Sequence, residues 1–153
     1  SNLRSALSGS GSGAMPNDLV PELAVTDWRR SRCFYCDLLG FAVIYERPEE
    51  GFSYLRLGAA DLMIDEIGKG RTFDAGEGPW RAPLGRGMNL QIRVAQIAPL
   101  LAALEGAGRS LYLPVEERWY RTGAGEVGNR QFIIADPDGY LLRFHEHLGY
   151  RPA

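Results

Sequence analysis

The strongest constraint on the fold is an order of structural signals that occurs twice along the chain. A short strand, a helix that ends at glycine and three further strands are predicted in the first half, and the same order returns in the second. The helix-ending glycines Gly40 and Gly108 are 68 positions apart, and the strand valines Val25 and Val94 are 69 positions apart. Two landmarks with nearly the same offset indicate an internal duplication. We therefore expect two β-α-β-β-β modules and an α+β fold class.

The first module is predicted at about residues 19–68. Asp27 is a suitable N-cap for a helix over 28–39, and Gly40 is the expected helix end. Short apolar or alternating runs bounded by turn residues predict strands at 19–25, 41–47, 52–57 and 62–67.

The second module is predicted at about residues 88–148, after a loop rich in glycine and proline at 68–87. Its helix carries an apolar stripe at positions i, i+3, i+4 and i+7, formed by Ile97, Leu100, Leu101 and Leu104. Strands are predicted at 89–94, 110–115, 130–135 and 140–146, with a tight turn at 136–139. Two small curved sheets of this kind are expected to pair and to leave a groove between them.

Composition bounds the class of protein. Residues 1–14 include a Gly/Ser linker and are interpreted as an expression remnant before Met15, so a single domain is expected at 15–153. These first residues lack the apolar core of a secretory signal, which makes the cytoplasm the expected location. The net charge of −2 argues against nucleic-acid binding. No apolar run approaches the roughly 20 residues that cross a bilayer, so we expect no membrane partner.

Side chains that often carry chemistry form no recognisable catalytic site. Cys33 and Cys36 have C-x-x-C spacing but fall inside the predicted first helix, which favours structural cysteines over a metal or redox site. His145 and His147 share a face of the last predicted strand, and no further metal ligand is evident beside them. No Ser/His/Asp arrangement is indicated with only these two histidines, so we predict no catalytic residues.

Two motifs resemble a known family. The segment Ser31-Arg32-Cys33-Phe34-Tyr35, followed by Leu39-Gly40-Phe41, is similar to the S-x-x-F-Y-x-x-x-L-G-F helix of the glyoxalase/bleomycin-resistance (vicinal oxygen chelate) superfamily. Asp136-Pro137-Asp138-Gly139 resembles the hairpin before its last strand. The resemblance implies that the two modules pair into a curved mixed sheet. The resemblance does not decide the function, because this superfamily contains lyases, dioxygenases, thiol transferases and drug-binding proteins.

The resemblance also places the residues that would hold a metal ion in the metal-dependent members. These positions correspond to Val20, Asp65, Asn89 and Arg143. Only Asp65 is a good cation ligand, because valine has no donor atom, an amide oxygen is a weak donor and arginine is permanently positive. We therefore predict no metal and no other cofactor. An ion pair between Asp65 and Arg143 is the hypothesis for this place, against the alternative that both side chains reach solvent.

Strand alternation predicts which side chains line the groove. If Asp65 faces the groove, its strand neighbours Leu62 and Ile64 face the helix layer. The same register in the other strands places polar side chains on the groove wall and apolar ones on the helix side. The predicted wall consists of Glu22, Asp65, Asn89, Gln91 and Arg143.

Aromatic side chains supply the second functional signal. Six of them lie outside the helix stripes, around the expected groove: Tyr45, Phe52, Tyr54, Trp80, Trp119 and Tyr120. Flat side chains can stack on a planar heteroaromatic ligand. By the resemblance, Tyr45 and Phe52 fall near aromatic positions that hold bleomycin at a dimer interface in the drug-binding members. Gly128 stands where some of these binders have tryptophan, and the chain departs from them there.

These observations predict a metal-independent protein that binds a small molecule. The expected ligand is aromatic, and acidic loops beside the aromatic residues are compatible with a cationic one, such as a bleomycin-type antibiotic that is sequestered. The predicted ligand-binding residues are Tyr45, Phe52, Tyr54, Asp65, Trp80, Asn89, Gln91, Trp119, Tyr120 and Arg143. A homodimer is expected. The alternative is a metal-dependent lyase or dioxygenase of the same superfamily.

Overall fold

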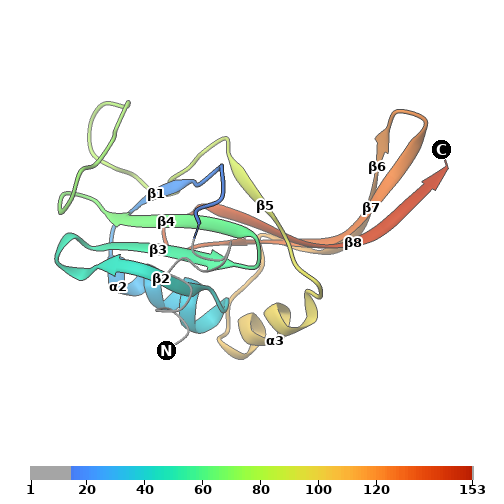
Figure 1. The fold of residues 1–153 in the computed structure, drawn as a ribbon, viewed down its shortest axis with the longest axis horizontal. Helices are drawn as coiled ribbons and strands as arrows, with labels where there is room; N and C mark the ends of the chain where they lie inside the picture. Colours follow the sequence, from blue (N-terminus) through green and yellow to red (C-terminus); the bar gives the residue numbers. More distant parts are fainter. Residues whose placement is uncertain (1–14, 153) are drawn as a thin grey trace. The chain divides into compact units, whose positions relative to one another are not determined.

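A four-stranded mixed sheet with a helix is built twice in the chain (Figure 1). The computed structural model describes residues 15–152, so the expected linker at 1–14 lies outside the described residues. The chain divides after Trp80 into two units, which we call unit 1 and unit 2. None of the helices in residues 15–152 is long and apolar enough to cross a membrane.

Unit 1 contains the first module. Its elements are β1 (Glu22–Val25), α2 (Trp28–Arg32), the π-helix η2 (Cys33–Leu38), β2 (Ala42–Arg47), the short 3₁₀-helix η3 (Pro48–Glu50), β3 (Phe52–Leu57) and β4 (Ala60–Glu66). The strands are arranged in the order β1-β4-β3-β2. β1 and β4 are parallel, whereas the other neighbours are antiparallel.

Unit 2 contains the second module. Its elements are β5 (Asn89–Arg93), α3 (Ala98–Gly106), β6 (Leu113–Thr122), β7 (Gly125–Ala135) and β8 (Leu141–Pro152). The strand order β5-β8-β7-β6 repeats that of unit 1, again with the first and last strands of the module parallel. The repeated β-α-β-β-β topology and the α+β class predicted from the sequence are confirmed.

The first helix begins as predicted. The Asp27 carboxylate accepts a hydrogen bond from the Arg30 backbone N–H at 3.1 Å, which satisfies one free donor of the first turn. The second half differs from a regular α-helix, because the Leu39 N–H bonds to the carbonyl of Phe34, five residues back. This wider turn places the adjacent residues Phe34 and Tyr35 in the core, in edge-to-face contact at 5.4 Å. Gly40, with a φ of +83°, ends the helix.

Apolar strand residues pack on one face of each sheet, as alternation predicted. In unit 1, Leu62 and Ile64 are buried, whereas Met63 between them is only partly buried. In unit 2, Leu142 and Phe144 of β8 are fully buried. The opposite face of the unit 1 sheet carries a second buried cluster, formed by Ile44, Phe52 and Tyr54, beside side chains that are available for other roles.

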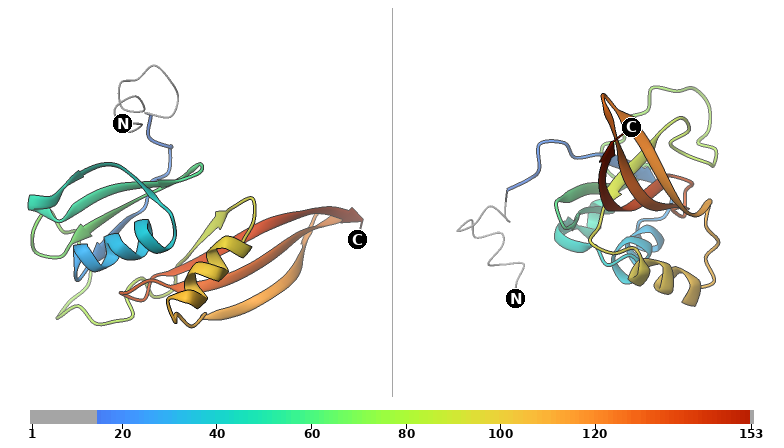
Figure 2. Two further views of the ribbon diagram at one scale, coloured as in Figure 1. Left: turned by 90° about the horizontal axis from the view of Figure 1, so that it is seen from below. Right: turned by 90° about the vertical axis from the view of Figure 1, so that its right-hand side faces the viewer.

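The last three strands are longer than predicted, and this is a correction. β6 reaches Thr122, β7 begins at Gly125 and β8 continues to Pro152, so the second module extends past its expected end at about 148. Gly123, with a φ of +59°, closes a two-residue hairpin turn between β6 and β7. We call residues 116–130 and 146–152 the arm. Figures 1 and 2 show the arm extending beyond α3 within unit 2.

Candidate functional site

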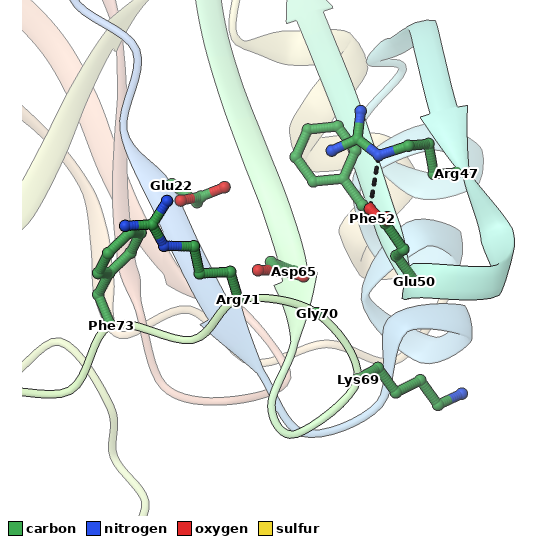
Figure 3. Close-up of a pocket in the computed structure, with 9 residues that line it drawn as sticks. All are labelled: Glu22, Arg47, Glu50, Phe52, Asp65, Lys69, Gly70, Arg71 and Phe73. Atoms are coloured by element: carbon green, nitrogen blue, oxygen red, sulfur yellow. Dashed lines mark hydrogen bonds and ion pairs between the residues drawn. The ribbon is translucent and has the colours of Figure 1, made fainter.

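A pocket of about 500 Å³ lies on the face of the unit 1 sheet that carries Phe52 and Asp65 (Figure 3). These two residues are cross-strand partners on β3 and β4. The loop that follows β4 supplies the facing wall, from Lys69 to Phe73. We call this cavity the unit 1 pocket.

Asp65 lies at the base of the unit 1 pocket and is 9% exposed. Burial raises the pKa of its carboxyl group, the nearby Glu50 carboxylate raises it further, and the Arg47 guanidinium opposes both. The loop passes directly beside this group at Gly70, where a Cβ atom would lie 3.1 Å from Asp65 Oδ1. Glycine therefore leaves room for the carboxylate.

Glu22 of β1 provides a second carboxylate in the same pocket. Burial raises its pKa, and the negative charge of Asp65 raises it further, while Arg47 lowers it. Neither Glu22 nor Asp65 forms an ion pair or a side-chain hydrogen bond with another described residue. Asp65 is nearly buried whereas Glu22 is exposed, and neither negative charge is neutralised by such a partner, so a bound cation would relieve the cost of ionising Asp65.

Two of the three basic residues of the pocket form ion pairs. Arg47 forms an ion pair with Glu50 at 2.6 Å, and its guanidinium lies 4.1 Å from the centre of the Phe52 ring. Lys69 pairs with Glu66 at 2.9 Å. Arg71 forms no ion pair with a described residue.

The Arg71 guanidinium lies 4.8 Å from the centre of the Phe73 ring (Figure 3). Once the paired charges are set aside, the pocket holds two carboxylates, Glu22 and Asp65, against this one guanidinium. Two arginines of the pocket lie over aromatic rings: Arg47 over Phe52 and Arg71 over Phe73.

The predicted aromatic residues of unit 1 lie together on its sheet. Tyr45 stacks on Tyr54 at 5.2 Å with an interplanar angle of 18°, and its ring centre is 5.8 Å from that of Phe52. Tyr54 is buried, and its hydroxyl donates to Asp61, so burial and this bond raise the pKa of Tyr54 to about 12. Tyr45 is 42% exposed. Trp80 lies apart in the loop after β4 and does not line the pocket.

Three predicted residues of unit 2 meet in one hydrogen-bond network. Arg143 donates from Nε to Asn89 Oδ1 at 3.2 Å and from Nη1 to the Tyr120 hydroxyl at 3.4 Å. Tyr120 also accepts from Gln131 Nε2 at 2.7 Å. Gln91, the cross-strand partner of Arg143, contacts His145 Nε2 at 3.2 Å through its amide nitrogen.

Sequence reasoning missed Gln131 and His145 as members of this polar network. Both are buried and are register partners, and Gln131 Oε1 and His145 Nδ1 have no hydrogen-bond partner among the described residues. Burial lowers the pKa of His145, and the positive charges of Arg143 and Arg93 lower it further. Both effects favour the neutral imidazole. Alternation from Arg143 along β8 was the available signal for His145.

Trp119 is partly buried and packs against residues of its own unit. It pairs across the strands with Gly128, and a Cβ atom at residue 128 would lie 2.6 Å from the indole ring. The Arg151 guanidinium lies 4.0 Å from the centre of the indole. A larger residue at 128 would therefore displace Trp119, which explains physically why glycine stands at this position.

Of the four positions that the resemblance assigns to a metal, only Asp65 is a good ligand for a divalent ion. The Asn89 Oδ1 atom, which is a weak metal ligand, already accepts a hydrogen bond from Arg143 Nε. Within residues 15–152, no three His, Cys, Asp or Glu side chains are grouped closely enough to hold a metal ion. Asp65 belongs to unit 1 and Arg143 to unit 2, so the predicted ion pair between them stays a prediction.

Comparisons with known proteins agree on the family. The model of the Glyoxalase/Bleomycin resistance protein/Dioxygenase superfamily matches residues 19–144. A bleomycin resistance protein from Geobacillus stearothermophilus is 26% identical over 145 residues, which cover 84% of this chain and 96% of that protein.

Two solved structures share the fold. TioX from Micromonospora sp. ML1 is 23% identical with a TM-score of 0.63, over 86% of this chain and 99% of that chain. TnmS3, an antibiotic binding protein from Streptomyces sp. CB03234, is 20% identical with a TM-score of 0.53, over 88% of this chain and 98% of that chain.

Proposed function

This chain belongs to the Glyoxalase/Bleomycin resistance protein/Dioxygenase superfamily, and on that premise we propose that it binds a flat, cationic organic molecule without transforming it. The curated relative at 26% identity is a bleomycin resistance protein. We extend its ligand class to this chain: a bleomycin-type antibiotic, held by sequestration in the cytoplasm by a homodimer.

One observation carries the proposal: Glu22 and Asp65 share the unit 1 pocket without an ion-pair partner of their own. A cation beside them would gain two charge-assisted contacts, and the contact with the nearly buried Asp65 would be the stronger because it is less exposed to water than the contact with the exposed Glu22. Phe52 and Phe73 would flank the flat part of the ligand. A pocket of about 500 Å³ fits a ring system with a charged tail, which is one portion of a larger antibiotic.

The polar network of unit 2 is proposed as a separate set of ligand contacts, which does not depend on the unit 1 pocket. Arg143 and Asn89 would contact polar groups of a ligand, and the Tyr120 hydroxyl, which accepts two hydrogen bonds, keeps its own proton free to donate. Gln91, Trp80 and the remaining predicted residues stay as proposed contacts. No proton transfer or nucleophile is needed, because stoichiometric binding is sufficient for sequestration.

Calorimetric titration with bleomycin, in the presence of EDTA, tests the proposal. We expect saturable binding by the natural chain and at least tenfold weaker binding by Asp65→Asn, since a contact between charged groups is replaced by a neutral one. Glu77→Gln, a change in the exposed part of the same loop, is the matched control and should bind normally. Absence of binding at ligand concentrations well above micromolar would exclude the bleomycin assignment.

Metal analysis of protein purified without chelator separates sequestration from the enzymatic alternative. The proposal expects no stoichiometric Fe, Mn, Ni or Zn and the same bleomycin affinity with and without EDTA. About one tightly bound ion per chain, with activity lost on its removal, would instead support a lyase or dioxygenase.

A further inference from the structure

A second cavity, of about 300 Å³, lies in unit 2 where the turn between β7 and β8 meets the loop before β5. We call it the unit 2 cavity. Its side chains are mainly apolar, and the one charged group is a guanidinium: the lining includes Leu84, Arg86, Met88, Tyr112, Ala135 and Leu141. No residue that lines it carries a carboxylate, in contrast to the unit 1 pocket.

The walls of the unit 2 cavity are held by close backbone contacts. A Cβ atom at Gly139 would lie 2.5 Å from Pro83 Cβ, and one at Gly85 would lie 2.4 Å from the Tyr140 ring. Both glycines have positive φ angles, and the Leu84 N–H donates to the Asp138 carbonyl at 2.8 Å. The loop and the turn are therefore in direct contact, which gives the cavity a defined shape before any ligand arrives.

The rim of the unit 2 cavity exposes apolar groups to solvent. Met88 is 45% exposed and Tyr112 is 66% exposed, while Leu84 beneath them is buried. A thioether and a phenol ring favour contact with an aromatic body. Arg86 forms no ion pair with a described residue, so its charge is available to an anionic group.

We propose that the unit 2 cavity is a second ligand site, which takes a small amphipathic anion. The aromatic body would lie between Met88, Tyr112 and Leu84, and a sulfonate or carboxylate would lie against Arg86. The size of the cavity is at the lower end for small-molecule sites and suits a body of two or three rings. This site does not depend on the function proposed for the unit 1 pocket, and its preferred charge is the opposite one.

The test uses 1-anilinonaphthalene-8-sulfonate as the anion and N-phenyl-1-naphthylamine as a neutral analogue. The chain has three methionines, so ¹³C-methyl labelling gives a simple spectrum in which Met88 reports the unit 2 cavity and Met63 reports the unit 1 sheet. We expect the sulfonate to shift the Met88 signal and to leave Met63 unchanged. A shift of Met63 alone, or no shift of Met88, would overturn the proposal.

Two variants sharpen the test. Arg86→Gln should weaken sulfonate binding about threefold, as expected for a rim ion pair, and leave the neutral analogue unchanged. Arg118→Gln on the arm is the matched control and should change neither. Equal loss of both probes in Arg86→Gln, or none of either, would contradict the assigned role of its charge.

Filling the cavity provides an independent check. Ala135→Leu adds volume to the wall and should abolish the Met88 response to both probes, while circular dichroism and the Met63 signal remain native. Undiminished binding in this variant would place the site elsewhere. If Ala135→Leu fails to fold, the Arg86→Gln comparison alone decides the proposal.

Discussion

Units 1 and 2 have the same strand order but opposite chemistry on corresponding strands. In unit 1, Asp65 lies on β4, the strand parallel to β1, in a pocket with Glu22 and two aromatic rings. In unit 2, Arg143 lies on β8, the strand parallel to β5, and bonds to Asn89 and Tyr120. The topology was retained after duplication, while the face that does not pack against the helix diverged in charge.

The comparison separates two kinds of constraint. Residues that pack on the helix side are apolar in both units, because burial of apolar surface stabilises each sheet. On the other face, Phe52 and Tyr54 of unit 1 are buried as well, whereas the polar residues there differ between the units in charge, hydrogen bonding and exposure. The functional residues of each unit are therefore expected on the sheet face that does not pack against the helix.

The largest change in the free energy of unfolding is expected for a substitution in the arm, which has no counterpart in unit 1. Gly128→Val places a branched side chain where the Trp119 ring lies, with the first added atom 2.6 Å from it. We expect a loss of about 2–3 kcal/mol in the free energy of unfolding, measured by urea denaturation. The double variant Gly128→Val with Trp119→Ala removes the clash and should recover part of the loss. Equal stability of natural chain and Gly128→Val would show that Trp119 is not held against Gly128.

A second prediction concerns the two kinds of carboxylate within unit 1. Asp61 accepts from Tyr54 and Arg56, and these bonds outweigh burial and lower its pKa from 3.8 to about 2. Because the folded-state pKa is depressed, Asp61 stabilises the fold above its unfolded pKa, and this contribution is lost as the pH falls through about 2.

The contribution of Asp61 is about 2 kcal/mol, obtained from the size of the shift. The unfolding free energy of Asp61→Asn, measured by urea denaturation, should therefore decline less between pH 5 and pH 2 than that of the natural chain. Asp74→Asn, in the exposed loop, serves as the control and should follow the natural chain. Parallel pH profiles for all three proteins would contradict the role assigned to Asp61.

The smallest expected effect has the opposite sign. Burial raises the pKa of Asp65 in the folded protein, so its ionised form opposes folding at neutral pH, and stability rises as the pH falls through the folded-state pKa. Asp65→Asn should therefore stabilise the chain at pH 7 by roughly 0.5 kcal/mol while it weakens ligand binding. The gain should shrink as the pH falls through the folded-state pKa of Asp65. A destabilised Asp65→Asn at pH 7 would mean that the carboxylate has a structural role.

The repeat, the Asp27 cap and the faces of the strands could be predicted because each rests on local periodicity or a single capping bond. The arm could not be predicted, because residues 116–122 contain glutamates and arginines and lack an alternation of apolar and polar residues. The π-helix η2 (Cys33–Leu38) likewise has no periodic pattern of apolar residues by which it could be predicted.

The site was predictable only in part. Asp65, Glu22 and Phe52 share one pocket because they face the same way on neighbouring strands, which alternation captures. Arg71 and Phe73 complete that pocket from a loop, whose path is set by tertiary packing and not by a repeat. Gln131 was not predicted because its place in the polar network depends on the register between β7 and β8, and the local sequence does not fix that register.

We expect the cationic group of a ligand to bind in unit 1 and not in unit 2. Benzamidine and benzamide differ in charge and little in shape, and both can be followed in the ¹³C-methyl methionine spectrum at pH 7. We expect that benzamidine shifts the Met63 signal, that benzamide does not, and that Asp65→Asn removes the benzamidine response. Equal shifts from both compounds, or a benzamidine response confined to Met88, would contradict this expectation.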